Sequence, residues 1–159
     1  MLHLFNHALI KCALFLALGN IYLRLGSVEI HHMHGLARQM PWTMAAFVAG
    51  GLSLIGVPLT AGFISKWYLV SAAFTAGYWP LAVLVLVSSL LALIYIWRVV
   101  EAAYFQVPGA DMHKVREAPA SMLIPAWLLI GANIYVGIDA GLIIDIAQQG
   151  AAVLVGQIP

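Results

Sequence analysis

One lysine, Lys66, stands alone in a long uncharged stretch, and this sets the class of fold that is open to the chain. It has 27 uncharged residues before it, back to Arg38, and 31 after it, up to Arg98. Stretches of this length are typical of membrane-spanning segments, where a lysine costs about 2.5–3.5 kcal/mol on insertion scales. The composition agrees, since 64% of the 159 residues are hydrophobic and 8% are charged. A quarter of an ordinary globular chain is charged, roughly.

The sequence therefore predicts a membrane protein. It excludes a soluble globular protein, a disordered chain and a nucleic-acid binder, because 13 charged residues could not cover a soluble surface. A single cysteine, Cys12, excludes a disulfide framework.

Four apolar segments predict an all-α, polytopic membrane fold. Residues 2–24, 80–104 and 120–138 are each long enough to cross a bilayer as a helix. The segment 41–78 is too long for one straight helix and short for two. Pro58 and Gly62 lie in its middle, and proline and glycine disfavour a continuous helix there. We expect either a turn between two short spans or one span that is broken near 57–62.

The distribution of basic residues favours one broken crossing. If 41–78 crosses once, the loops 24–38 and 98–117 lie on the same side, and all five loop basic residues share that side. We predict that the protein lies in the inner (cytoplasmic) membrane of the cell. By the positive-inside rule, both basic loops then face the cytoplasm. We therefore predict four crossings within residues 1–138, the second discontinuous. The tail 139–159 is expected to lie at the interface or to pack on a neighbour.

The first predicted helix has a polar stripe. His3, His7 and Lys11 are spaced four residues apart, so they lie on one helical face. Imidazole exchanges protons near neutral pH, and a lysine can do so when burial disfavours its charged form. The stripe predicts a proton relay, although packing of structurally satisfied polar groups is the alternative. Lys66 lies close after the expected break, a recurring arrangement in ion carriers.

Other polar residues give weaker signals. Glu101 follows Arg98 by three residues, so the two can pair on a helix face, and Glu101 could stand at the mouth of a proton path. The residues His31, His32 and His34 are of metal-ligand type, but an interfacial loop is the simpler interpretation. We expect no metal and no cofactor, because the sequence contains no HExxH pattern and no other cofactor motif.

Two motifs resemble those of antiporter-like membrane subunits, which occur in respiratory complex I and in multisubunit Mrp sodium/proton antiporters. The first is H-x-x-x-H-x-x-x-K, from His3 to Lys11. The second runs from Gly56 to Lys66 through the expected break. The segments 65–69 and 95–98, with Glu101, look most like the MrpD-type subunit of the Mrp antiporters.

The resemblance implies a fold of about fourteen helices in two inverted repeats, of which this chain is similar to the last four, the second being the broken helix. It implies that Lys66 exchanges protons with the far-side exit and that His3, His7 and Lys11 connect it to a central polar axis. We expect the C-terminal part of a longer subunit, with the missing N-terminal helices among its partners.

The function expected on this basis is proton translocation within an Mrp-type Na⁺/proton antiporter. A proton-pumping membrane-arm subunit of a complex I-like oxidoreductase or a membrane-bound hydrogenase is the first alternative. In either assembly the partners would be other subunits, protons and, for the antiporter, Na⁺. The chain itself is expected to transport rather than to catalyse a redox step. The second alternative is a non-functional remnant or scaffold.

Overall fold

The computed structural model describes residues 2–109 and 115–154. The described residues form helices and no strand, so the predicted all-α class is confirmed. The elements are α1 (Leu2–Leu25), η1 (Ile30–Met33), η2 (Leu36–Arg38), α2 (Pro41–Ile55), α3 (Ala61–Thr75), α4 (Trp79–Phe105), α5 (Ala120–Ile138) and α6 (Gly141–Leu154), where η denotes a 3-10 helix.

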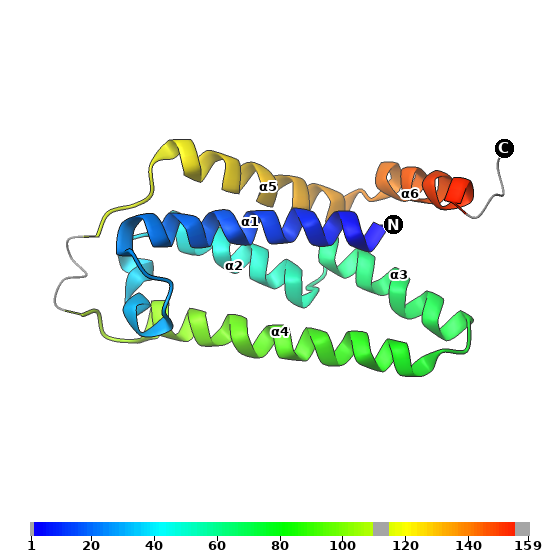
Figure 1. Ribbon diagram of the computed structural model, residues 1–159, viewed down its shortest axis with the longest axis horizontal. Coiled ribbons are helices and arrows are strands. Elements are labelled where there is room, and N and C mark those ends of the chain that lie inside the picture. The colour runs from blue at the N-terminus through cyan, green and yellow to red at the C-terminus, as the bar shows by residue number, and fades with distance from the viewer. Residues whose placement is uncertain (1, 110–114, 155–159) are drawn as a thin grey trace.

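The helices traverse the long axis of the molecule four times. Figure 1 shows α1 running one way, α2 and α3 returning in succession, α4 running back and α5 returning again. Within the described parts of the chain, three helices, α1, α4 and α5, are long and apolar enough to cross a membrane. With 15 residues each, α2 and α3 are about 23 Å long, shorter than a hydrocarbon core of about 30 Å. They therefore form one crossing only together, and the expected discontinuous second span is confirmed.

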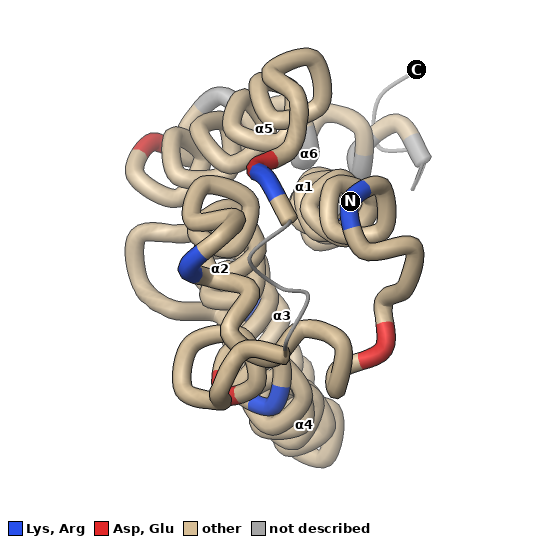
Figure 2. The backbone as a smooth tube through the Cα atoms, turned by 90° about the vertical axis from the view of Figure 1, so that its left-hand side faces the viewer, with Lys and Arg blue, Asp and Glu red and all other residues tan. Residues whose placement is uncertain are grey.

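The connections α1–α2 and α4–α5 lie at the same end of the bundle (Figure 1). Figure 2 looks onto this end, where basic and acidic residues gather around the helix termini. Residues 110–114 of the expected basic loop 98–117, among them Asp111 and Lys114, lie outside the described residues. The broken crossing thus places the described parts of both basic loops together, as the charge argument requires.

Glu117 forms hydrogen bonds to two helices at the end of the bundle that holds the α1–α2 and α4–α5 connections. Its carboxylate accepts hydrogen bonds from the Trp42 backbone N–H at 2.8 Å and from Thr43 Oγ1 at 2.6 Å. These groups lie in the first turn of α2, whose N–H groups have no intrahelical partners. Arg24, in the last turn of α1, donates to the Glu117 carbonyl through Nε and Nη2 at 3.1 and 2.7 Å. One residue of the α4–α5 connection therefore links the end of α1 to the start of α2.

The larger buried cluster lies between α1, η1, η2, α2 and α4. A smaller one lies between α1, α2 and α5, and small residues let these helices approach. Ala13 and Ala17 of α1 are fully buried, and a Cβ at Gly50 of α2 would lie 3.0 Å from the Leu14 side chain. The outer side of α4 instead exposes large apolar side chains, which suits contact with lipid; they include Leu84, Leu86, Leu90, Leu91 and Ile94. The helix α6 follows a short bend after α5 (Figure 1). Residues 141–154 of the expected tail are therefore part of a helix, α6.

Candidate functional site

The break in the second crossing occupies residues 56–60, between the end of α2 and the start of α3. Gly56 ends α2 in the left-handed region, at φ 97°, a conformation that favours glycine. Leu59 also has a positive φ of 70°, which is strained for a side chain of its kind. Thr60 caps α3, since its Oγ1 accepts from the Phe63 N–H at 3.4 Å and donates to the Val57 carbonyl at 2.7 Å.

Pro58 and Gly62, the expected break residues, have different positions. Pro58 lies in the irregular segment, where it can end the helix as predicted. Gly62 lies outside the break, in the first turn of α3. A Cβ there would overlap the Ser53 carbonyl of α2. The reason for glycine at this position is therefore the close approach of the two half-helices, not flexibility of the break.

Lys66 reaches back from α3 to the end of α2. Its Nζ donates to the carbonyls of Leu54 at 2.7 Å and Ile55 at 3.0 Å, and to Ser89 Oγ of α4 at 2.6 Å. An ammonium group has three N–H donors, so these contacts satisfy all of them. The last carbonyls of a helix have no intrahelical partners and carry partial negative charge. The end of α2 therefore stabilises the Lys66 cation without a carboxylate among the described partners.

A cavity of about 340 Å³ lies beside Lys66, between α3 and α4. Its wall contains Lys66, Ser89 and Gly56 together with apolar side chains such as Phe63 and Trp67. The polar groups of the lysine site therefore border open space on the α4 side of the broken helix, where water molecules could bridge proton transfers.

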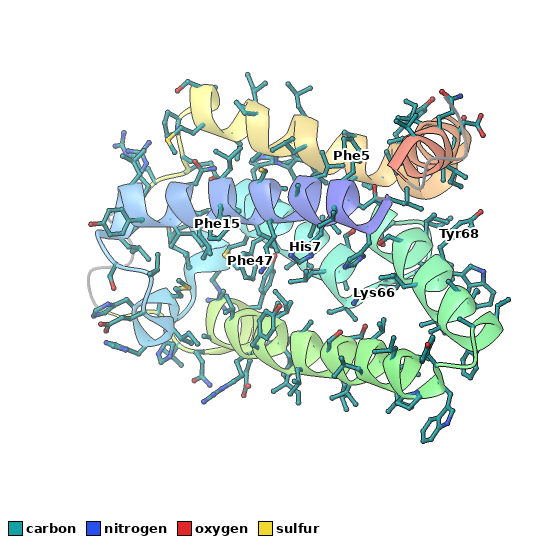
Figure 3. The ribbon with its side chains drawn as sticks, turned by 45° about the vertical axis from the view of Figure 1, so that its right-hand side comes forward. Phe5, His7, Phe15, Phe47, Lys66 and Tyr68 are labelled. Atoms are coloured by element: carbon teal, nitrogen blue, oxygen red, sulfur yellow. The ribbon has the colours of Figure 1, made fainter. Side chains whose placement is uncertain are left out.

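The first residues of α1 contact the start of α3. His3 Nδ1 lies 3.1 Å from Ser65 Oγ, and Asn6 Nδ2 donates to the Ala61 carbonyl at 3.0 Å. The rings of His3 and His7 have centroids 5.6 Å apart. Figure 3 shows His7 projecting from α1 and Lys66 from α3 into the interior of the bundle, whereas Tyr68 points away. The structure thus brings His3 next to the residue that precedes Lys66.

Lys11, one turn after His7, is half-buried and lines a second cavity of about 190 Å³ between α1, α2 and α4. Leu54 lines the same cavity, and its carbonyl accepts the hydrogen bond from Lys66. Among the described residues no direct hydrogen bond joins His3, His7 or Lys11 to Lys66. Proton transfer between the stripe and Lys66 would therefore need water.

Glu101 lies apart from this cluster. It is exposed on α4, twelve residues after Ser89, which is about 18 Å along the helix. Glu101 and Arg98 line a cavity of about 180 Å³ at the loop end. The described residues contain no ion pair between them, since the acidic partner of the described pairs is Glu29. The expected pairing with Arg98 is therefore not formed.

Two residues of the site, and one buried polar residue of α5, were not found from the sequence. Ser65 and Ser89 lie within apolar segments and gave no periodic signal. Asn133 of α5 is 1% exposed, and neither polar atom of its side chain has a hydrogen-bond partner among the described residues. Its position as a polar residue in an apolar span was the one available signal. Asn6 Oδ1 is likewise buried without a described partner, and such atoms in native proteins are often satisfied by water.

The chain is similar to known membrane proteins along most of its length. Residues 1–92, which include His3, His7, Lys11, Lys66 and Ser89, match the family described as NADH:quinone oxidoreductase/Mrp antiporter, TM. It is 41% identical over 149 residues to the N subunit of the NADH-quinone oxidoreductase of Desulforudis audaxviator, covering 86% of this chain and 29% of that protein. It is 26% identical over 152 residues to the D subunit of the Na(+)/H(+) antiporter of Bacillus subtilis, covering 96% and 31%.

A solved structure is similar as well. One chain of the membrane-bound sulfane sulfur reductase, an archaeal respiratory membrane complex, superimposes with a TM-score of 0.80 and 33% identity, covering 87% of this chain and 23% of that one. The present chain therefore spans less than a third of the length of these relatives.

Proposed function

The chain belongs to the NADH:quinone oxidoreductase/Mrp antiporter transmembrane family, and from this premise we propose that it moves protons across a membrane as part of a multisubunit complex. The observation that supports the proposal most directly is the position of Lys66. Its Nζ lies at the end of α2, within hydrogen-bond distance of two backbone carbonyls and Ser89 Oγ. A half-buried cation held by neutral groups can lose its proton without leaving a negative charge behind.

Lys66 would alternate between an ammonium and an amine. The ammonium is attracted to the carbonyls of Leu54 and Ile55 by charge–dipole interaction. When Nζ gives a proton to water in the adjoining cavity, this attraction weakens because the amine is neutral. A proton that arrives by way of Lys11, His7 and His3, with bridging water, restores the ammonium. Hydration of the break, at Pro58 and the adjoining residues, would control access to the lysine.

Replacing Lys66 in the complete complex tests this proposal. Lys66→Ala should abolish coupled proton transport in proteoliposomes, measured with a pH-sensitive dye, while the complex still assembles. Lys66→Arg should also abolish transport, because a guanidinium does not give up its proton. Tyr68→Phe is the matched control, as Tyr68 is exposed on the same helix. Proton flux that is unchanged in an assembled Lys66→Ala complex would refute the proposal.

Two candidate assemblies differ in the source of energy that drives proton transport. An Mrp-type Na⁺/proton antiporter is the assembly expected from the sequence, and similarity to the Bacillus subtilis antiporter protein supports it. A redox-driven, complex I-like oxidoreductase or hydrogenase is the second candidate, supported by the higher identity to the Desulforudis audaxviator oxidoreductase protein and to the archaeal respiratory complex. Proton uptake into proteoliposomes that hold the complex, driven by a Na⁺ gradient, would assign the first. Uptake that requires an electron donor and acceptor would assign the second.

We also propose that the protein lies in the inner membrane with the two basic loops in the cytoplasm. The support is that both loops lie at one end of the bundle (Figure 1) and include Arg24, Arg38 and Arg98. A cysteine introduced at Ser27, in a chain with Cys12→Ser, should be labelled by an impermeant maleimide in inside-out vesicles and protected in intact cells. The opposite pattern would invert the orientation. The scaffold alternative predicts assembly without any effect of Lys66→Ala on transport.

A further inference from the structure

The connection between α1 and α2 brings together three potential metal ligands that the transport proposal does not use. Glu29 precedes η1 in an extended conformation. His31 and His32 lie within η1. All three side chains are exposed. The carboxylate thus stands at the start of the turn that presents both imidazoles.

The donor atoms have spacings suited to one ion. His31 Nε2 lies 3.3 Å from Glu29 Oε2, and His32 Nδ1 lies 3.9 Å from the same oxygen. One donor atom from each residue lies within 4.8 Å of the other two. In a tetrahedral site with bonds of about 2.1 Å, two donors lie about 3.4 Å apart. Small rotations of the three side chains would therefore bring their donors around a shared centre.

From this geometry we propose that Glu29, His31 and His32 bind a divalent transition-metal ion such as Zn²⁺ or Cu²⁺. Imidazole nitrogen and carboxylate oxygen are common ligands of these ions. Three protein ligands leave a fourth position for water. A cleft of about 690 Å³, lined by both histidines, provides access for the ion and that water.

Two neighbours shape the site without belonging to the ligand group. Ser27 Oγ lies 3.0 Å from His32 Nδ1 and accepts from the Glu29 backbone N–H at 3.2 Å. This hydroxyl holds the imidazole until an ion takes its place at Nδ1. His34 lines the same cleft but is outside the group of three. It therefore serves as the matched control for an imidazole at the same surface.

The competing interpretation is an ordinary surface interaction between a carboxylate and two imidazoles, in a loop that lies at the membrane interface. The two interpretations differ in which side chains are needed to bind the ion. An ion-binding site requires Glu29 and both histidines together, whereas a surface ion pair predicts only weak binding that any nearby histidine could support.

Titration of the complete complex with Cu²⁺, followed by pulsed electron paramagnetic resonance, tests the proposal. The wild-type complex should show imidazole nitrogen couplings, and Zn²⁺ should displace this copper. The double variant His31→Ala, His32→Ala should bind one Cu²⁺ fewer per chain. Glu29→Gln should weaken binding of the same ion, and His34→Ala should leave it unchanged.

Two results would overturn the proposal. The first is equal copper stoichiometry and affinity in the wild type and the double variant. The second is loss of the ion in His34→Ala with retention in the double variant. Circular dichroism of each variant checks that the helices are intact. Proton transport should be retained in the metal-free double variant, so the outcome is independent of the test on Lys66.

Discussion

Replacing Glu117 with alanine should loosen the first turn of α2. The carboxylate accepts from the Trp42 N–H at 2.8 Å and from Thr43 Oγ1 at 2.6 Å. Since the first N–H groups of a helix have no intrahelical acceptor, protection of the Trp42 amide depends on this side chain. A hydrogen bond to a charged group contributes about 1.5–3 kcal/mol. If that free energy sets the opening equilibrium, the Trp42 amide should exchange about 10- to 140-fold faster in Glu117→Ala.

Hydrogen–deuterium exchange of the peptide that covers the start of α2, measured on the complete complex, gives this rate directly. Glu117→Gln should lie between the wild type and Glu117→Ala, because a neutral amide oxygen still accepts but lacks the charge. Glu101→Gln is the matched control, since that carboxylate is exposed on α4 and caps no helix. An unchanged Trp42 rate in Glu117→Ala would refute the argument that a distant loop caps this helix.

Two further substitutions test the lysine site and the break. Ser89→Ala should reduce coupled proton transport by about tenfold, because it removes the 2.6 Å hydrogen bond from Lys66 Nζ. Ser88→Ala, on the exposed side of α4, should leave transport unchanged. Equal transport rates in the two variants would exclude a role for the Ser89 hydroxyl. Gly62→Ala should lower the free energy of unfolding of the solubilised complex by about 1–3 kcal/mol, because the new methyl group overlaps the Ser53 carbonyl. Thermal unfolding followed by circular dichroism measures this loss. Gly131→Ala, with open space around its Cβ position, should cause no such loss; an equal loss in both would contradict close packing of the half-helices.

The sequence predicted the broken crossing because its signals are local. Pro58 removes a backbone N–H donor and disfavours continuation of a helix beyond its first turn. The position of Lys66 within a long uncharged stretch indicates a cation at membrane depth. The distribution of the basic residues favoured one crossing over two, and α2 and α3 run in succession along the same direction (Figure 1). Resemblance to the antiporter-like family supplied the expected roles of His3, His7 and Lys11, which the residues alone left open.

The partners of these residues could not be predicted in the same way. Whether Ser89 meets Lys66 depends on the rotation of α4 about its axis, and an almost uniformly apolar helix gives no periodicity from which that rotation could be obtained. The cap that Glu117 provides joins residues 75 positions apart, so no local capping pattern reveals it. The role of Gly62 was misassigned for a related reason: glycine signals both flexibility and close approach, and only the neighbouring backbone distinguishes them.

Two of the three acceptors that hold Lys66 are peptide oxygens, and this affects which substitutions the site tolerates. Any amino acid at positions 54 and 55 presents the same oxygen, so exchanges among apolar side chains that keep the packing of these two residues leave the groups that meet the amine unaltered. The restriction falls instead on Gly56, whose backbone conformation ends the helix there. A Cβ at Gly56 would also come within 3.1 Å of the Lys66 side chain. In related chains, substitutions should therefore accumulate at positions 54 and 55 sooner than at the glycine beside them.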